Sequence, residues 1–140
     1  MKTIILITLF ISSLFSNELL VTYDTDTDKN FTITFDSKSY MIKSTEKEKL
    51  DKFVDFLFTN YHLSIDLEGH TDSVGSKKQN MKLAIKRAET VKAYFISEGI
   101  IESRINTIAC GESRPLAPNN IKEHRQINRR VVAKTFETFK

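Results

Sequence analysis

Two hydrophobic periodicities alternate along the chain, and their order constrains the fold more than any other feature. Residues 31–35 and 63–67 alternate apolar and polar side chains, which is the period of a half-buried strand. After each of these segments, apolar residues recur every three or four positions, as they do in an amphipathic helix. These apolar positions are Leu50, Phe53, Val54, Leu57, Phe58 and Tyr61 in the first helix, and Ala84, Ala88, Val91 and Phe95 in the second.

The rest of the chain completes a simple topology. Residues 104–110 and 131–136 predict two further strands, and residues 121–128 predict a short helix that Asn119 or Asn120 would cap. The element order is therefore βαβαβ(α)β. It predicts an α+β fold with a mixed four-stranded sheet and the helices packed on one face.

Local signals predict where the two long helices begin and end. Residues 45–48 (Thr-Glu-Lys-Glu) and 76–79 (Ser-Lys-Lys-Gln) both have the spacing of a capping box. Gly99 follows the second apolar stripe and predicts its C-terminal stop. Between the second strand and the second helix, residues 69–75 predict a loop.

Composition narrows the class of protein. A chain of 140 residues is long enough for one domain, and 40% hydrophobic residues can supply its core. A formal net charge of +3 is too small to suggest nucleic acid as a partner. The single cysteine, Cys110, excludes an internal disulfide and a multi-cysteine metal site.

The N-terminal residues have the pattern of a targeting segment. Lys2 precedes an apolar run and a stretch with small residues, so residues 1–16 are expected to be a secretory signal peptide cleaved after Ser16. The alternative is an uncleaved membrane anchor. No cysteine follows the apolar run to carry a lipid. Residues 17–30 are expected to be a flexible lead-in to a domain at 31–140, and export predicts a periplasmic location, with a possible outer-membrane association.

Three alternating acidic residues in the lead-in suggest a calcium loop, but the spacing does not fit one. The run begins at Asp24, Asp26 and Asp28. Its sixth position is Lys29 where glycine is needed, and its twelfth is Phe35 where glutamate is needed.

The densest polar cluster lies between the second strand and the second helix. Residues 68–75 have the sequence Glu-Gly-His-Thr-Asp-Ser-Val-Gly, and Asn80 and Arg87 follow on one face of the helix. That face is not the one that carries the buried stripe. Asp72 and Arg87 together would suit a zwitterion, because the carboxylate accepts from an ammonium group while the guanidinium binds a carboxylate. The alternative is a structural salt bridge between the two residues.

Several spaced motifs resemble the OmpA-like domain. This family includes the C-terminal domain of outer-membrane protein A, the peptidoglycan-associated lipoprotein and the flagellar stator protein MotB. The resemblance covers about residues 31–140. It is carried by residues 68–75, Asn80, Leu83, Arg87-Ala88, Val91, Gly99-Ile100, Arg104-Ile105, Gly111-Glu112, Pro115, Asn119 or Asn120, Arg125 and the segment 128–131.

The resemblance implies non-covalent binding of peptidoglycan through the diaminopimelate of its stem peptide. The family's key acidic residue and key arginine fall on Asp72 and Arg87. Thr71 and Asn80 match positions that help line the family's pocket, and Arg129 matches a further arginine near it. The family implies no cofactor and no catalytic residue, and an outer- or inner-membrane envelope protein as a further possible partner.

The sequence departs from the family pattern at three positions. Ala109 and Cys110 stand where Gly-Tyr is common, and His124 stands where glycine is common. Because glycine often occupies positions of positive φ, side chains at Ala109 and His124 could alter the loops. These departures bear on fine specificity, since Asp72 and Arg87 are both present.

Two other functions compete with wall binding. The same fold could act as a protein-interaction module in an envelope complex without wall binding. An enzyme such as a wall hydrolase would need a nucleophile or metal set that the sequence does not display. His62, His70 and His124 lack the spacing of zinc ligands, and Cys110 is expected to be a small core residue.

Overall fold

The computed structural model describes residues 30–137, and the proposed signal peptide, nearly all of the lead-in and the three aspartates lie outside this range. The elements in chain order are β1 (Asn30–Thr34), α1 (Ser44–Thr59), β2 (Leu63–His70), α2 (Lys77–Ser97), a 3₁₀ turn (Glu102–Arg104), β3 (Ile105–Gly111), α3 (Lys122–Asn128) and β4 (Arg130–Glu137).

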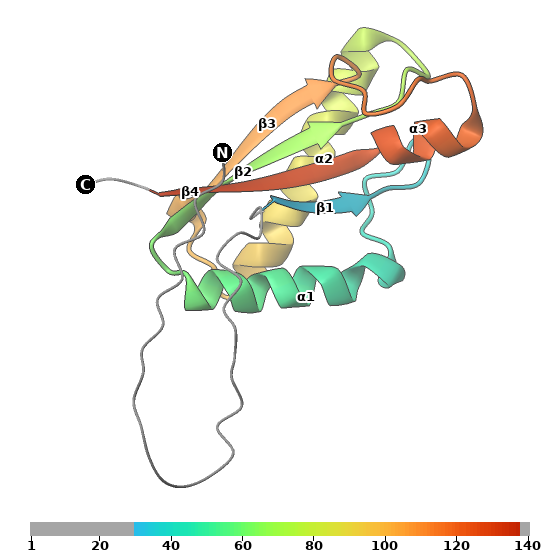
Figure 1. Ribbon diagram of the computed structural model, residues 1–140. Coiled ribbons are helices and arrows are strands. Elements are labelled where there is room, and N and C mark those ends of the chain that lie inside the picture. Colours follow the sequence, from blue (N-terminus) through green and yellow to red (C-terminus); the bar gives the residue numbers. More distant parts are fainter. Residues whose placement is uncertain (1–29, 138–140) are drawn as a thin grey trace, which may run out of the picture.

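The four strands form one mixed sheet in the order β1-β4-β2-β3 (Figure 1). β2 and β3 run parallel and are joined through α2, whereas β4 is antiparallel to both β1 and β2. The predicted α+β fold and mixed sheet are confirmed. β4 returns between β1 and β2, so the chain's two N-terminal strands are not neighbours.

The core lies between the sheet and the two long helices. Inward-facing residues of β1, β2 and β4 pack with the apolar stripes of α1 and α2 in one buried cluster, which includes Ile33, Ile65, Leu67 and Val131 from the strands. Its helical members include Leu50, Leu57, Val91 and Phe95. The helices therefore share one face of the sheet, as the pattern predicts.

Gly69 brings α2 unusually close to β2. A Cβ atom at Gly69 would lie 2.0 Å from the carbonyl oxygen of Ala84, so only glycine fits there. This contact fixes the N-terminal half of α2 beside the end of β2, where the polar cluster lies.

The predicted limits of α2 are confirmed. The Ser76 hydroxyl accepts from the Gln79 amide at 3.2 Å while the Gln79 side chain accepts from the Ser76 amide, which is a complete capping box. After the helix, Gly99 adopts a φ of +98°, the left-handed conformation that ends helices.

The capping box predicted for α1 is wrong. α1 begins at Ser44 with Lys43 at the N-cap and no side-chain cap. The carboxylate of Glu46 instead accepts from the Thr34 hydroxyl at 2.6 Å and from Lys49 at 2.8 Å. Thus Glu46 connects the helix to β1.

Two apolar residues assigned to the buried face of α1 are exposed. The helix ends at Thr59, so Tyr61 lies beyond it and is 78% exposed, while Phe58 is 53% exposed. The apolar period continues past the point where the helix stops, and periodicity alone gives no sign of this.

The remaining differences concern element ends. β2 continues to His70, so the predicted loop begins two residues later than expected. α3 has Ile121 at its N-cap and no side-chain cap, so neither Asn119 nor Asn120 caps it. The Asn119 side chain instead accepts from the Ser73 amide at 3.2 Å, joining two loops.

Candidate functional site

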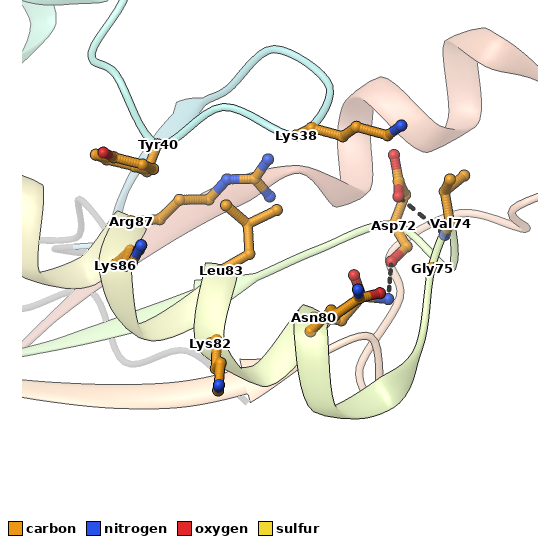
Figure 2. Close-up of a pocket in the computed structure, with 11 residues that line it drawn as sticks. Lys38, Tyr40, Asp72, Val74, Gly75, Asn80, Lys82, Leu83, Lys86 and Arg87 are labelled. Atoms are coloured by element: carbon orange, nitrogen blue, oxygen red, sulfur yellow. Dashed lines mark hydrogen bonds between the residues drawn. The ribbon is translucent and has the colours of Figure 1, made fainter.

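The polar cluster lines a pocket of about 500 Å³ where β2 meets α2. Its walls come from the segment that follows β1, from the loop after β2 and from the N-terminal half of α2 (Figure 2). Among the predicted site residues, Asp72, Asn80 and Arg87 line this pocket. All three are buried, at 6%, 3% and 0% exposure.

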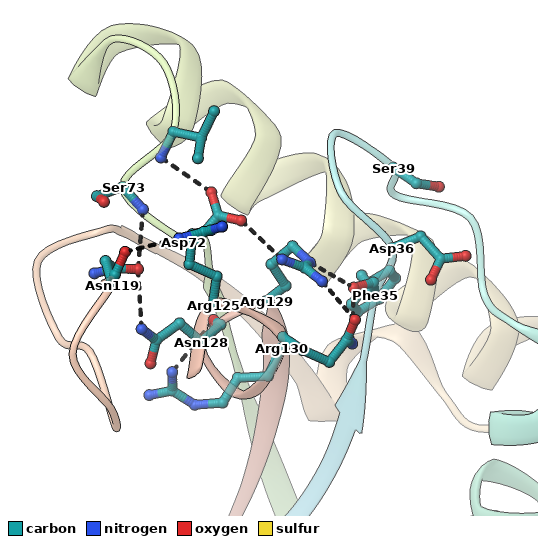
Figure 3. Close-up of polar contacts among 12 residues, drawn as sticks. Phe35, Asp36, Ser39, Asp72, Ser73, Asn119, Arg125, Asn128, Arg129 and Arg130 are labelled. Atoms are coloured by element: carbon teal, nitrogen blue, oxygen red, sulfur yellow. Dashed lines mark hydrogen bonds and ion pairs between the residues drawn. The ribbon is translucent and has the colours of Figure 1, made fainter. Parts of the chain in front are cut away.

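Asp72 is held by partners on both carboxylate oxygens (Figure 3). Its Oδ1 accepts from the Val74 amide at 3.1 Å, and its Oδ2 accepts from Nη1 of Arg129 at 3.0 Å. The backbone bond is the local turn that aspartate favours after a strand. These two bonds fix the carboxylate in one orientation at the edge of the pocket.

Arg129 is therefore the ion-pair partner of Asp72. Its Nε donates to the Phe35 carbonyl at 3.0 Å, which joins the end of β1 to the start of β4. Arg129 does not line the pocket but supports Asp72 from outside it. The sequence alone left open a salt bridge between Asp72 and Arg87, and among the described residues the ion pair of Asp72 is with Arg129.

Arg87 is fully buried, contrary to the expectation that its helix face lies away from the core. Its guanidinium donates to three backbone carbonyls: Nε to Ser39 at 2.8 Å, Nη1 to His70 at 2.8 Å and Nη2 to Asp36 at 3.1 Å. The guanidinium also lies 5.2 Å from the centre of the Phe35 ring. Arg87 thus joins α2, the end of β2 and the segment after β1.

The electrostatics of Arg87 keep it charged at neutral pH. Burial lowers its pKa to about 10, while the nearby charge of Asp72 acts in the opposite direction. A guanidinium has five N–H groups, and three are used by the carbonyls. Two N–H groups remain for another acceptor.

Thr71 and Asn80 have different surroundings. The Asn80 amide donates to the Asp72 carbonyl at 3.2 Å and to the Glu112 carboxylate at 2.5 Å, so it fixes the loop against α2. Thr71 is 2% exposed and does not line the pocket, and its hydroxyl has no partner among the described residues. Its amide donates to the Gly111 carbonyl at 2.8 Å.

Sequence reasoning missed three lysines that line the pocket: Lys38, Lys82 and Lys86. Together with Arg87 they outnumber the single lining carboxylate, that of Asp72, so the pocket lining carries a net positive charge. Lys82 and Lys86 are four residues apart on α2, a spacing that could have revealed them. Lys38 gave no such signal, because it lies on a separate segment that is joined to α2 by the bonds from Arg87 to Asp36 and Ser39.

The departures from the family pattern leave the backbone unstrained. Among the described residues, Lys38 is the one non-glycine residue with positive φ, at 57°, so neither Ala109 nor His124 occupies a glycine-type conformation. Cys110 is buried and free, as expected, and burial raises the pKa of its thiol. The His124 ring bonds the Asn120 side chain at 3.0 Å.

The pocket combines a fixed carboxylate, a buried guanidinium and several ammonium groups, an arrangement that suits the class of proteins that bind anionic or zwitterionic ligands. The comparison with protein families agrees with this class. Residues 34–129 match the model of the OmpA family, and the chain belongs to that family. Domains of this family typically bind peptidoglycan and are not enzymes.

Relatives in sequence are cell-envelope proteins. The chain is 38% identical over 104 residues to the peptidoglycan-associated lipoprotein of Buchnera aphidicola, covering 74% of this chain and 60% of the lipoprotein. It is 35% identical over 101 residues to outer membrane porin F of Pseudomonas fluorescens, covering 72% of this chain and 31% of the porin. The match therefore spans about a third to three fifths of these relatives' length.

Solved structures share the fold. The peptidoglycan-associated lipoprotein of Burkholderia pseudomallei superposes with a TM-score of 0.73 at 24% identity, over 75% of this chain and 89% of that one. The cell wall anchor of the type VI secretion system of Pseudomonas aeruginosa superposes with a TM-score of 0.67, also at 24% identity, over 78% and 81%. Within residues 30–137, no helix is both long and apolar enough to span a bilayer.

Proposed function

We propose that this chain binds peptidoglycan non-covalently through the diaminopimelate of the stem peptide. The free end of diaminopimelate is an amino acid, with an ammonium and a carboxylate on the same carbon. In this proposal, Asp72 accepts from the ammonium, and the two remaining N–H groups of Arg87 bind the carboxylate. Arg129 and Asn80 hold Asp72 in place through its carboxylate and its backbone carbonyl, and the Thr71 amide anchors the start of the same loop to Gly111.

The observation that carries the proposal is the fixed geometry of Asp72 and Arg87 around one pocket. Both side chains are held by bonds from the protein itself, so neither has to lose conformational freedom when the ligand binds. Arg129 also pairs with Asp72 from outside the pocket, so the second carboxylate oxygen has a fixed partner at 3.0 Å.

The lysines around the pocket favour a ligand with more than one carboxylate. Lys38, Lys82 and Lys86 surround the zwitterion site and outnumber the single lining carboxylate. Diaminopimelate has two carboxylates, and the stem peptide carries another on its glutamate. A simple amino acid such as lysine has one carboxylate and can pair with only some of the cationic groups of this pocket.

In the cell, this function places the domain in the periplasm, where it connects the cell wall to another envelope component. Export by residues 1–16 and a domain at 31–140 are part of this proposal. The matched relatives are envelope proteins, which supports the location.

The test is co-sedimentation with purified insoluble sacculi. Asp72→Asn keeps the size of the side chain and removes its charge, so we expect binding to fall by about ten- to a hundredfold, the value of one charge-assisted contact. The matched control is Asp55→Asn, which removes an exposed carboxylate on α1 far along the chain from the pocket. Circular dichroism confirms that each variant is folded.

Competition tests the ligand itself. Free diaminopimelate should displace the protein from sacculi, and lysine should displace it less because it lacks the second carboxylate. Equal binding by wild type and Asp72→Asn would refute the proposed site. A folded wild-type protein that does not bind sacculi would favour the alternative, an interaction module without wall binding.

A further inference from the structure

A second buried polar cluster lies on the face of the sheet opposite the helices. Glu68 and His70 are two residues apart on β2, so both point away from the core side that Leu67 and Gly69 occupy. Cys110 lies on the neighbouring strand β3. One potential ligand atom from each residue lies within 4.8 Å of the other two, and all three residues are buried.

The His70 ring is the anomaly in this cluster. It is 1% exposed, and neither of its ring nitrogens has a hydrogen-bond partner among the described residues. Its Nε2 lies 3.7 Å from Oε2 of the Glu68 carboxylate, which is longer than a hydrogen bond. Buried polar atoms without partners are costly and rare, so they point to a missing ligand.

We propose that Glu68, His70 and Cys110 bind a divalent transition-metal cation of the zinc class. A carboxylate, an imidazole and a thiolate are the three donor types that zinc prefers in proteins. Three protein ligands leave a fourth, open position for water.

The distances suit such an ion. Zinc–ligand bonds of about 2.0–2.3 Å in a tetrahedral site place the ligand atoms about 3.5 Å from one another. The 3.7 Å between His70 and Glu68 already matches this spacing. The Cys110 sulfur lies within 4.8 Å of both, so the three side chains move closer together when an ion binds.

The neighbouring cations do not exclude a metal. Lys134 and Arg114 lie 2.9 Å and 3.6 Å from Glu68, but their side chains are 47% and 66% exposed and can turn toward solvent. Arg130 is buried and lies close enough to interact with Cys110 and Glu68. The carboxylate and the thiolate together cancel the two positive charges of the ion, so Arg130 meets a site without net charge.

The cluster is separate from the pocket, but His70 is hydrogen-bonded to Arg87, which lines the pocket. The His70 backbone carbonyl accepts from Arg87 on the pocket side, while its ring joins Glu68 and Cys110 on the other face. A metal would therefore fix the end of β2 from which the pocket loop begins. The inference does not depend on wall binding.

The experiment is a metal titration of the full chain under reducing conditions after treatment with a chelator. Zn²⁺ binding is measured by competition with a chromophoric chelator, and Co²⁺ serves as a spectroscopic probe. We expect one Zn²⁺ per chain. We also expect the Co²⁺ complex to show the charge-transfer absorption that only a thiolate ligand produces.

Two variants sharpen the result. Cys110→Ser should weaken Zn²⁺ binding at least tenfold and remove the charge-transfer band. His62→Gln, which removes an exposed histidine, should change neither. A wild-type chain that binds no Zn²⁺, a Co²⁺ spectrum without the thiolate band, or equal affinity in Cys110→Ser would overturn the proposal. The wild-type spectrum decides the matter even if a variant fails to fold.

Discussion

The two polar clusters on either side of the end of β2 are both buried, yet they differ in how their polar atoms are satisfied. On the pocket side, Asp72 and Arg87 are each fixed by several hydrogen bonds from the protein. On the opposite face, the His70 ring has no hydrogen-bond partner within residues 30–137. The first arrangement suits an exchangeable organic ligand, because rigid groups bind it without reorganising. The second suits an ion, which supplies the missing partner itself.

The comparison depends first on Arg87, whose removal should have the largest effect. Arg87→Ala leaves one buried and two part-buried carbonyls without their donor and opens a cavity, so we expect a loss of about 3–5 kcal/mol in the free energy of unfolding. Urea denaturation measures this loss. Lys82→Ala, an exposed change on the same helix, is the control and should cost less than about 0.5 kcal/mol. A stable Arg87→Ala protein would mean that these bonds do not hold the pocket together.

The next largest effect is expected from the His70 ring and concerns how the stability of the protein depends on pH. Burial lowers its pKa from 6.5 to about 4, with a smaller opposing contribution from the Glu68 charge. The unfolded chain therefore takes up a proton before the folded one does, and stability falls as the pH drops from about 6.5 to 4. We expect this residue to account for roughly 3 kcal/mol of the loss.

Unfolding of the metal-free protein across this pH range provides the measurement. His70→Asn should flatten the pH dependence, whereas the exposed-site variant His62→Asn should retain it. If the free energy of unfolding of His70→Asn depends on pH as steeply as that of wild type, burial does not hold the imidazole neutral. The two clusters would then differ less than the comparison states.

A more conservative change separates charge from geometry in the pocket. Arg87→Lys keeps the cation but offers one nitrogen where three carbonyls are spread around a planar fork. We expect a smaller loss of stability than for alanine, but sacculus binding reduced by about ten- to a hundredfold. Co-sedimentation of the folded variant tests this. Near-normal binding would show that Arg87 supplies only its charge.

The smallest effect is expected from an exposed lysine that lines the pocket. Lys82→Gln removes one exposed ammonium group from the pocket, so sacculus affinity should fall roughly two- to fivefold at low salt. The difference should vanish at high salt, where exposed charges are screened. Lys47→Gln on α1 is the matched control. An effect that persists at high salt would assign Lys82 a direct contact instead.

The architecture could be predicted because the hydrophobic period of each segment, and the order of the segments, are visible in the local sequence. Alternation marked the strands, and the stripe from Ala84 to Phe95 marked the buried face of α2. The capping box predicted at Thr45 failed because the helix begins at Ser44, one residue before Thr45, and the side-chain contact of its first turn is the long-range one between Glu46 and Thr34. Element ends that depend on such contacts cannot be predicted from local pattern.

Three of the five predicted site residues line one pocket, but the bonds that connect them to the rest of the chain were not predicted. Asp72, Asn80 and Arg87 lie together as the loop and helix spacing indicated. The pairing of Asp72 with Arg129 spans 57 positions, and the burial of Arg87 depends on carbonyls near residue 36. Neither follows from spacing on one helix, because the Asp72–Arg129 pair joins the loop after β2 to the start of β4, and Arg87 is covered by the segment after β1.

The most direct test of the central claim is an NMR titration of the protein with free diaminopimelate. The account predicts that the amide resonances that shift are those of residues 36–40, 71–76 and the first turns of α2, which surround the pocket. Asp72→Asn should abolish these shifts, and the outer face of α1 should remain unaffected. Absence of any shift in a protein that binds sacculi, or shifts confined to another surface, would contradict the assignment of the pocket to diaminopimelate.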